Sequence, residues 1–296
     1  MPTLVSMRIE APLEQGHGVA SWAALQKAGA TRTDLRRALS TADLRRLRPG
    51  WYATPTADPA VVEAVQRGGV CSCVSALRLH GVWIPEGHSR VHARTRPANH
   101  NRKVRGFCRR FGRPLREGCA VDDVTTALAH AVRCLNREDT VVVLDSIMHK
   151  GLLSREEIEY LLRSTPERVQ SLLDLCAMAE AGTESMARLR LTDRGYRVRP
   201  QVEVPGLGRI DLLLGNRLII EVDGEEYHSS SEQFHSDRER DLEAYRLGFL
   251  PMRFAYRHVV HEWEERVQAV VAVVERGEHL PMPATQLTAD PMLSLP

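Results

Sequence analysis

The spacing of apolar and polar positions divides the chain into stretches with different periods. Residues 18–55 read as two short helices followed by two short strands. Between residues 122 and 181 apolar positions recur three or four apart, which is typical of helices. Residues 183–276 instead predict the order helix, three strands, helix, strand, helix. The pattern therefore predicts a multidomain protein of mixed α+β and α/β type.

Near the N-terminus the pattern predicts two helices joined by a glycine turn. Ser21 can cap the first helix, Gly29 ends it, and Thr31 can cap the second. The apolar positions expected to face inward are Trp22, Leu25, Ala28, Leu35 and Leu39. In the second helix, the polar and charged residues expected to face outward are Arg32, Thr33, Arg36 and Arg37. A helix pair with a basic outer face is the helix-turn-helix arrangement, whose second helix enters the major groove of DNA.

The following segment, LRRLRPGWYAT, predicts two short strands around the turn at Pro49 and Gly50. Its basic residues are Arg45, Arg46 and Arg48. This strand pair would be the wing of a winged helix that binds double-stranded DNA. Helix pairs with arginines also occur in proteins that never touch DNA, so the pattern alone leaves both interpretations open.

Charge separates the two halves of the chain, although the whole carries a formal net charge of only +2. Residues 1–120 hold 20 Lys and Arg against 8 Asp and Glu, whereas residues 121–296 hold 20 against 30. An excess of cations in one half is suited to a polyanion. General use of arginine as a solubilising residue is the alternative, but it does not explain why the excess is confined to one half.

The first third of the chain resembles the N-terminal module of AbiEi-type antitoxins and related regulators. The resemblance rests on the helix pair, the wing and the segment CSCVSALRLHGVWIP, which contains a SALxLHG pattern. It implies a winged-helix domain at residues 1–56 and a middle α+β region with a helical bridge at residues 57–180. It also implies DNA binding or autoregulation, with a toxin as a partner if the protein is a regulator.

The cysteines and histidines do not predict a zinc site. Cys71 and Cys73 have a single residue between them, and no second pair follows at zinc-finger spacing. His88, His92 and His100 fall in a basic stretch expected to form strands rather than a helix, so we expect solvated or phosphate-facing side chains there and not metal ligands. Reduced thiols are the expectation.

The helical bridge contains one pair that resembles an acid and a base. Asp145 and His149 are one helical turn apart, which predicts a surface ion pair rather than a catalytic pair. Ser154 and Glu157 predict a capping box at the start of a later helix.

The stretch RIDLLLGNRLIIEVDGEEYH places Asp211, Glu221 and Asp223 within aliphatic strands. An ionised carboxylate in such a strand is costly unless a partner compensates for it. A divalent cation such as Mg²⁺ is one such partner, because it prefers carboxylate oxygens.

Residues 180–276 resemble a family of unknown function related to the very-short-patch-repair endonuclease, within the PD-(D/E)XK superfamily. The signature is IEVDGxxYH, followed by a DxxRDxxLxxxG-like helix and an MRF strand. The resemblance implies a restriction-endonuclease-like mixed sheet flanked by helices at residues 181–280, with a tail at residues 281–296.

The same resemblance implies roles for individual residues. Asp211, Glu221 and the Val222 carbonyl would bind Mg²⁺ or Mn²⁺, and Glu184 would orient the site. Most superfamily members have lysine where this chain has Asp223, so His228 would take over activation of water. Arg240 and Arg253 would contact phosphate. The alternatives are that His228 caps the strand end, that Glu184 is an exposed first-turn acid, and that Arg240 pairs with Glu243 or Asp237.

Hairpin register provides a structural test. A three-residue loop of Gly215, Asn216 and Arg217 places Asp211 opposite Glu221, whereas a two-residue turn places it opposite Ile220. We predict the three-residue loop.

Two functions are consistent with the sequence. The first is a metal-dependent DNA endonuclease or nickase, for which the resemblance suggests phage defence. The second is a DNA-binding transcriptional regulator with a degenerate nuclease domain. RNA as substrate and a homodimer remain open. The chain shows no apolar run of about 20 residues and no basic, apolar leader, so we expect a cytoplasmic protein without a membrane partner.

Overall fold

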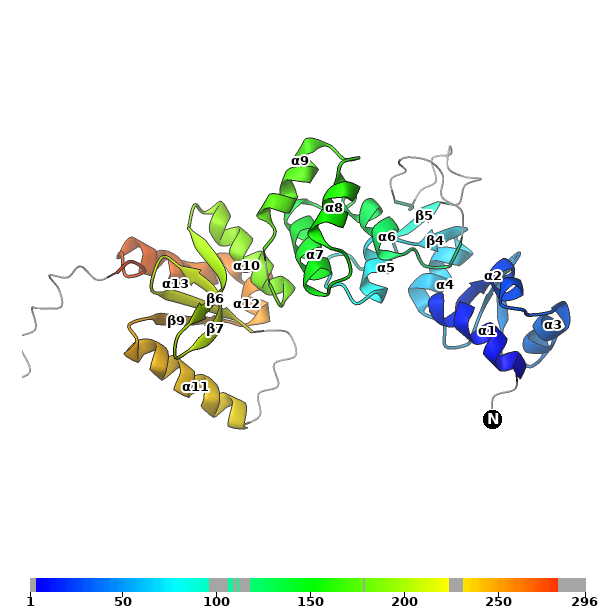
Figure 1. The fold of residues 1–296 in the computed structure, drawn as a ribbon, viewed down its shortest axis with the longest axis horizontal. Helices are drawn as coiled ribbons and strands as arrows, with labels where there is room; N and C mark the ends of the chain where they lie inside the picture. Colours follow the sequence, from blue (N-terminus) through cyan, green and yellow to red (C-terminus); the bar gives the residue numbers. More distant parts are fainter. Residues whose placement is uncertain are drawn as a thin grey trace, which may run out of the picture. The chain divides into compact units, whose positions relative to one another are not determined.

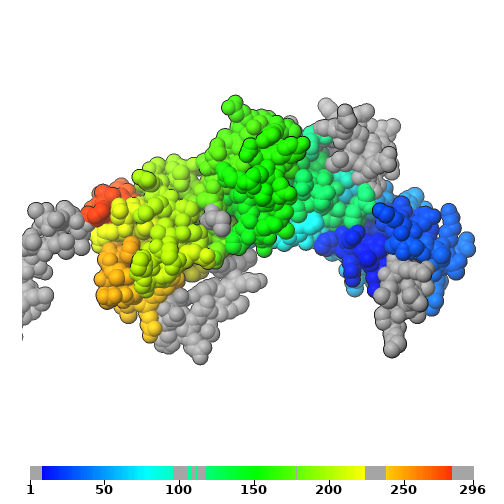
Figure 2. All heavy atoms as spheres, viewed as in Figure 1, coloured from blue at the N-terminus to red at the C-terminus, as the bar shows by residue number. Residues whose placement is uncertain are grey.

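A computed structural model describes residues 4–95, 106–108, 111, 118–177, 179–223 and 231–281, with the backbone alone at 4–8 and 231–237. The chain divides into two compact units that can be followed by colour in Figures 1 and 2. The N-terminal unit is Met1–Val143 with Lys150–Leu173, and the C-terminal unit is Leu144–His149 with Asp174–Pro296. Among the described helices, none is both long and apolar enough to cross a membrane. The finer division at residues 56, 180 and 280 stays a prediction.

The first part of the N-terminal unit contains the predicted helix pair and strand pair. In chain order its elements are α1 (Leu4–Gln15), β1 (Val19–Ser21), α2 (Trp22–Lys27), α3 (Arg32–Ser40), β2 (Arg45–Arg48) and β3 (Trp51–Ala53). The strands form an antiparallel sheet in the order β1-β3-β2. Helices α1, α2 and α3 bury a shared apolar cluster that includes Leu13, Leu25 and Ala38. Whether this arrangement is a winged helix stays a prediction.

The predicted helix caps are present. The Ser21 hydroxyl accepts a hydrogen bond from the Ala24 N–H at 3.1 Å, and Thr31 and Asp34 form a reciprocal capping box. The expectations for Ala28 and Leu39 were wrong: Ala28 is exposed, Leu39 is 38% exposed, and Ala38 takes the buried position of α3 instead. Positions three and four apart share one face of a helix, and here Leu35 and Ala38, which are three apart, pack against the cluster.

The rest of the N-terminal unit is mainly helical. Its elements are α4 (Pro59–Gln66), β4 (Gly69–Cys71), α5 (Cys73–Leu79), β5 (Ala93–Thr95), α6 (Val124–Ala131), α7 (Arg137–His149), α8 (Arg155–Leu162), α9 (Glu167–Gln170) and the 3-10 helix η2 (Ser171–Leu175). The last residues of α7 and η2 belong to the C-terminal unit. β4 and β5 pair antiparallel, and the predicted capping box of Ser154 and Glu157 is present.

The prediction for Asp145 was wrong. Its side chain is buried, and its carboxylate accepts hydrogen bonds from the Ser185 hydroxyl at 2.6 Å, the Arg188 guanidinium at 2.9 Å and the Ala177 N–H at 3.0 Å. His149 is exposed at the end of the same helix. Helical spacing identified neighbours on α7 but carried no information about the residues that pack against it.

The C-terminal unit is a four-stranded mixed sheet with helices on both sides (Figure 1). In chain order it contains α10 (Gly182–Asp193), β6 (Val198–Val204), β7 (Gly208–Leu214), β8 (Leu218–Val222), α11 (Ser231–Arg246), β9 (Leu250–Phe254), α12 (Tyr256–Val260) and α13 (Trp263–Glu275). The strand order is β6-β7-β8-β9, with β8 and β9 parallel and the other pairs antiparallel. Figure 1 shows α10, α12 and α13 on one side of the sheet and α11 on the other. The predicted order is confirmed, with α12 as an addition.

The β7–β8 hairpin has the predicted three-residue loop. Leu214 pairs with Leu218 and Leu212 with Ile220, which leaves residues 215–217 in the loop. The His279 carbonyl accepts hydrogen bonds from the Asn216 and Arg217 N–H groups at 2.9 and 3.2 Å. Gly215 has φ +63°, and a Cβ at that position would lie 2.5 Å from the His279 oxygen. This close approach selects glycine and fixes the register.

Candidate active site

The site begins with a row of charged residues across three neighbouring strands. Leu212 of β7 pairs with Ile220 of β8, so the next pair along the hairpin is Asp211 with Glu221. Glu221 in turn pairs with Arg253 on β9. Residues at paired positions project from the same face of a sheet. Two carboxylates and a guanidinium therefore share one face.

The Asp211 and Glu221 carboxylates each accept a hydrogen bond from the backbone of the other's strand. The Asp211 Oδ2 atom accepts a hydrogen bond from the Val222 N–H at 2.9 Å, and the Glu221 Oε2 atom accepts one from the Asp211 N–H at 3.4 Å. Each carboxylate is thus held against the backbone of the facing strand. These two hydrogen bonds orient both carboxylates toward the same part of the hairpin.

Glu184 joins this pair from α10. It is buried, and its carboxylate accepts hydrogen bonds from the N–H groups of Glu180 and Ala181 at 3.1 and 2.9 Å. The alternative of an exposed first-turn acid is therefore wrong. A cap to the start of α10 fixes the carboxylate in place.

Gln201 is a site residue that sequence reasoning missed. Its side-chain N–H donates to Glu184 at 2.8 Å, and the register of β6 and β7 places it opposite Asp211. Its φ is +49°, a left-handed conformation that is unfavourable for a residue with a Cβ. Strained residues concentrate at functional sites. No local pattern in RPQVEV signals this conformation.

Burial and mutual repulsion shape the acidity of the carboxylates. Burial first, then the charge of Asp211, raises the pKa of Glu184 to about 7 and the pKa of Glu221 to about 7. The Arg240 guanidinium opposes part of this shift at Glu221. Asp211 thus repels both buried glutamates, and a cation bound beside these carboxylates would be stabilised.

The two arginines predicted to contact phosphate are both engaged within the unit. Arg240 contacts Glu221 at 3.3 Å and donates to the Leu207 and Arg209 carbonyls. It does not pair with Glu243, which pairs with Arg246 instead. Asp237 lies outside the side chains that the structure describes.

Arg253 pairs with Asp241 of α11 at 3.0 Å and lies 3.9 Å from the Asp223 carboxylate. Asp223 continues β8, where its N–H donates to the Phe254 carbonyl at 2.8 Å. Asp223 therefore lies beside an arginine from the next strand. His228 lies outside the described residues.

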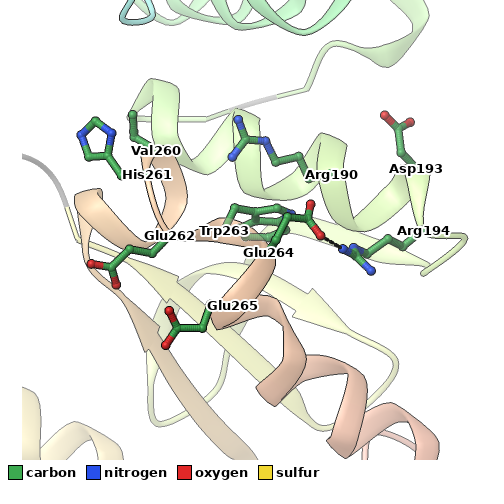
Figure 3. Close-up of a pocket in the computed structure, with 9 residues that line it drawn as sticks. All are labelled: Arg190, Asp193, Arg194, Val260, His261, Glu262, Trp263, Glu264 and Glu265. Carbon is green, nitrogen blue, oxygen red and sulfur yellow. Dashed lines mark hydrogen bonds and ion pairs between the residues drawn. The ribbon is translucent and has the colours of Figure 1, made fainter.

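A hollow in the same unit lies apart from these carboxylates (Figure 3). It is lined by residues 190, 193–194 and 260–265, and shares none with the acidic site. Arg194 pairs with Glu264 at 2.6 Å, and the Arg190 guanidinium lies over the Trp263 ring. This hollow does not contain the facing carboxylates of the candidate site, and its Arg194 is already paired with Glu264.

The predicted DNA-contacting residues of the N-terminal unit differ in exposure. Exposed on α3 and β2 are Arg32, Thr33, Arg36, Arg37, Arg45 and Arg46. Arg48 is half-buried, with its guanidinium 4.9 Å from the centre of the Trp51 ring. Among the seven, Arg48 thus has a packing role as well.

Comparison with known protein families gives one match. Residues 184–274 match the model of a restriction endonuclease-like family, REase_MTES_1575. No curated protein matches the chain. The match covers the acidic site and the mixed sheet, and supports a nuclease-like C-terminal domain with DNA as the substrate class.

Restriction-endonuclease-like domains generally use divalent metals, and the residues present fit such an ion. Asp211 and Glu221 provide oxygen donors at facing positions, and their proximity raises the pKa of Glu221. Neutralising such a pair is what Mg²⁺ or Mn²⁺ does in oxygen-ligand sites. The donor set is hard, without sulfur or imidazole among the described residues that form it.

Proposed function

We propose that the C-terminal unit is a divalent-metal-dependent DNA endonuclease or nickase. The observation that carries the proposal is the facing pair of Asp211 and Glu221, held by backbone hydrogen bonds on adjacent strands. The match to a restriction endonuclease-like family over the same residues supports it.

The residues divide the chemical work. Asp211 and Glu221, with the Val222 carbonyl, would hold Mg²⁺ or Mn²⁺, which when bound supplies an acidified water and charge neutralisation at a phosphate. Glu184 would accept a hydrogen bond or a proton beside them, since its pKa of about 7 lets it exchange protons at neutral pH. Gln201 orients Glu184. The Arg240 guanidinium would partly neutralise the charge of the Glu221 carboxylate. We keep Asp223 and His228 as candidates for orienting water.

We further propose that the N-terminal helix pair is a winged-helix module that brings the enzyme to duplex DNA. The exposed arginines of α3 and β2 and the excess of cations in residues 1–120 support this role. A role in defence follows by analogy with the families named above. A homodimer and a cytoplasmic location are carried over as expectations from the sequence alone.

The second candidate is a DNA-binding regulator with an inactive nuclease domain. One observation favours it: the position of the superfamily lysine holds Asp223, and the neighbouring Arg253 is paired with Asp241. A toxin partner belongs to this candidate alone.

Cleavage of supercoiled plasmid with Mg²⁺ or Mn²⁺ separates the two. We expect nicking or linearisation by the wild type, loss of at least about 100-fold in Asp211→Asn and Glu221→Gln, and no loss in the exposed-site control Glu275→Gln. DNA binding without cleavage in either metal would establish the regulator. Cleavage that persists in both site variants would overturn the assignment of the site.

A further inference from the structure

Four side chains of the N-terminal unit converge although they come from distant parts of the sequence. They are Cys73, His92, Cys108 and Cys134, and their ligand atoms all lie within 4.8 Å of one another. Cys73 is the first residue of α5, and His92 comes directly before β5. Cys108 lies in the short described segment 106–108, and Cys134 lies in the turn after α6. Cys71, the cysteine nearest to Cys73 in the sequence, is not part of the group.

The separation of one sulfur and nitrogen pair in the cluster matches that of two ligands around a single metal ion. Tetrahedral Zn²⁺ with Zn–S of about 2.3 Å and Zn–N of about 2.0 Å separates a sulfur from a nitrogen ligand by roughly 3.6 Å. The Cys108 Sγ and His92 Nδ1 atoms are 3.7 Å apart. A set of three thiols and one imidazole is the Cys₃His combination of structural zinc sites.

Hydrogen bonds link the three segments that carry Cys73, His92 and Cys108. The His92 carbonyl accepts from the Ser72 N–H at 3.0 Å, and the His92 N–H donates to the Ser75 hydroxyl at 2.9 Å. The Cys108 N–H donates to the Ala93 carbonyl at 2.9 Å. Thus α5, β5 and the segment of Cys108 are linked beside the cluster.

Arg67 anchors the same segment from α4. Its guanidinium donates to the carbonyls of Gly106 and Val91 and lies 5.1 Å from the centre of the Phe107 ring. Arg67, His92, Cys108 and Cys134 line one hollow, which gives an ion access to the cluster.

Cys73 carries a further sign of a constrained site. Its φ is +55°, in the left-handed region that is unfavourable for a residue with a Cβ. Buried free thiols would need neither this conformation nor a histidine among them. Strain of this kind is found where a side chain must be aimed at a ligand.

We propose that Cys73, His92, Cys108 and Cys134 bind a structural Zn²⁺ ion. The ion would cross-link four segments that are far apart in sequence and fix the middle of the N-terminal unit. This site is independent of the carboxylate site, because its ligands are soft and belong to the other compact unit.

Metal analysis of the full-length protein, purified and dialysed against metal-free buffer, tests the proposal. We expect about one zinc ion per wild-type chain and loss of most of it in Cys108→Ser and Cys134→Ser. Cys119→Ser and Cys176→Ser, at cysteines outside the cluster, should retain it. So should Asp211→Asn and Glu221→Gln, which separates this ion from one at the carboxylates.

Cobalt substitution in the wild type keeps the test decisive if the serine variants fail to fold. Tetrahedral Co²⁺ bound to thiolates should give visible d–d bands and a near-ultraviolet charge-transfer band. A wild-type chain that holds no zinc and gives no such spectrum would overturn the proposal, whether its thiols are free or joined in a disulfide. Zinc retained in Cys134→Ser but lost in Asp211→Asn would also overturn it.

Discussion

The Val222 N–H donates to the Asp211 carboxylate at 2.9 Å, so an acid of one strand is held against the backbone of the next. Val222 directly follows Glu221 in β8, so this hydrogen bond also keeps the Asp211 carboxylate close to Glu221. The pair is built by the hairpin, and its properties can be tested without DNA.

Binding of Mn²⁺ should stabilise the wild-type protein against thermal unfolding. A ligand at about 100 times its dissociation constant adds about 2.7 kcal/mol to the free energy of unfolding. Asp211→Asn should remove the rise in Tm, measured by calorimetry of the C-terminal transition, while Glu275→Gln keeps it. An equal rise in Asp211→Asn would place the ion elsewhere.

The affinity for Mn²⁺ should increase with pH up to about neutrality. Glu221 has a pKa of about 7 and must lose its proton to bind a cation, so each displaced proton changes the affinity by up to about tenfold per pH unit. Isothermal titration calorimetry from about pH 5 to about pH 8 measures this. A flat profile would contradict the raised pKa.

Without a divalent ion, stability should fall as pH rises from 4.5 to 7. The folded pKa values of Glu184 and Glu221 lie above their ordinary value of 4.5, so within this window the folded state binds more protons than the unfolded chain. The loss is up to about 1.4 kcal/mol per pH unit for each group. Glu221→Gln should flatten the profile in chemical denaturation. A steeper profile in Glu221→Gln than in the wild type would oppose this assignment.

Gln201→Gly should separate function from stability. Glycine accepts φ +49° without strain, so folding is retained, but Glu184 loses its side-chain donor. We expect cleavage to fall by about tenfold or more, with the midpoint of the pH–rate profile shifted upward as Glu184 binds its proton more tightly. Unchanged cleavage and an unshifted profile would remove Gln201 from the site.

Asp145→Ala should destabilise the C-terminal unit by about 3–5 kcal/mol, because it leaves Arg188 buried without its carboxylate partner. His149→Ala, one turn along the same helix and exposed, is the matched control and should change stability by less than about 0.5 kcal/mol. Urea unfolding measures both. Equal changes in the free energy of unfolding for the two substitutions would contradict the buried role of Asp145 and support the surface ion pair predicted from sequence.

Arg36→Ala and Arg37→Ala should weaken DNA binding and lower the salt dependence by about one ion each, if both contact phosphate. Arg163→Ala is the control, since Arg163 is exposed in the same unit but pairs with Glu159. Fluorescence anisotropy over a range of salt concentrations gives the slopes. Identical slopes in all four proteins would exclude α3 from the DNA contact.

The sequence by itself determined the local elements and the acids between them. The period of two along a strand allowed both a two-residue and a three-residue hairpin loop, and the expectation that Asp211 and Glu221 share a metal ion selected the three-residue loop, which the structure has. Capping residues such as Thr31 and Ser154 and the aliphatic strands around Glu221 are short-range signals. The order of elements in the C-terminal unit followed for the same reason.

Only the tertiary structure decided which distant residues meet. The burial of Asp145 against Arg188, the hydrogen bond from Gln201 to Glu184, and the meeting of Cys73 with His92, Cys108 and Cys134 all join segments far apart in the chain. No helical or strand period encodes these contacts, because they depend on how packed elements face one another. The left-handed backbone of Gln201 and Cys73 is likewise imposed by surrounding structure that overrides local preference.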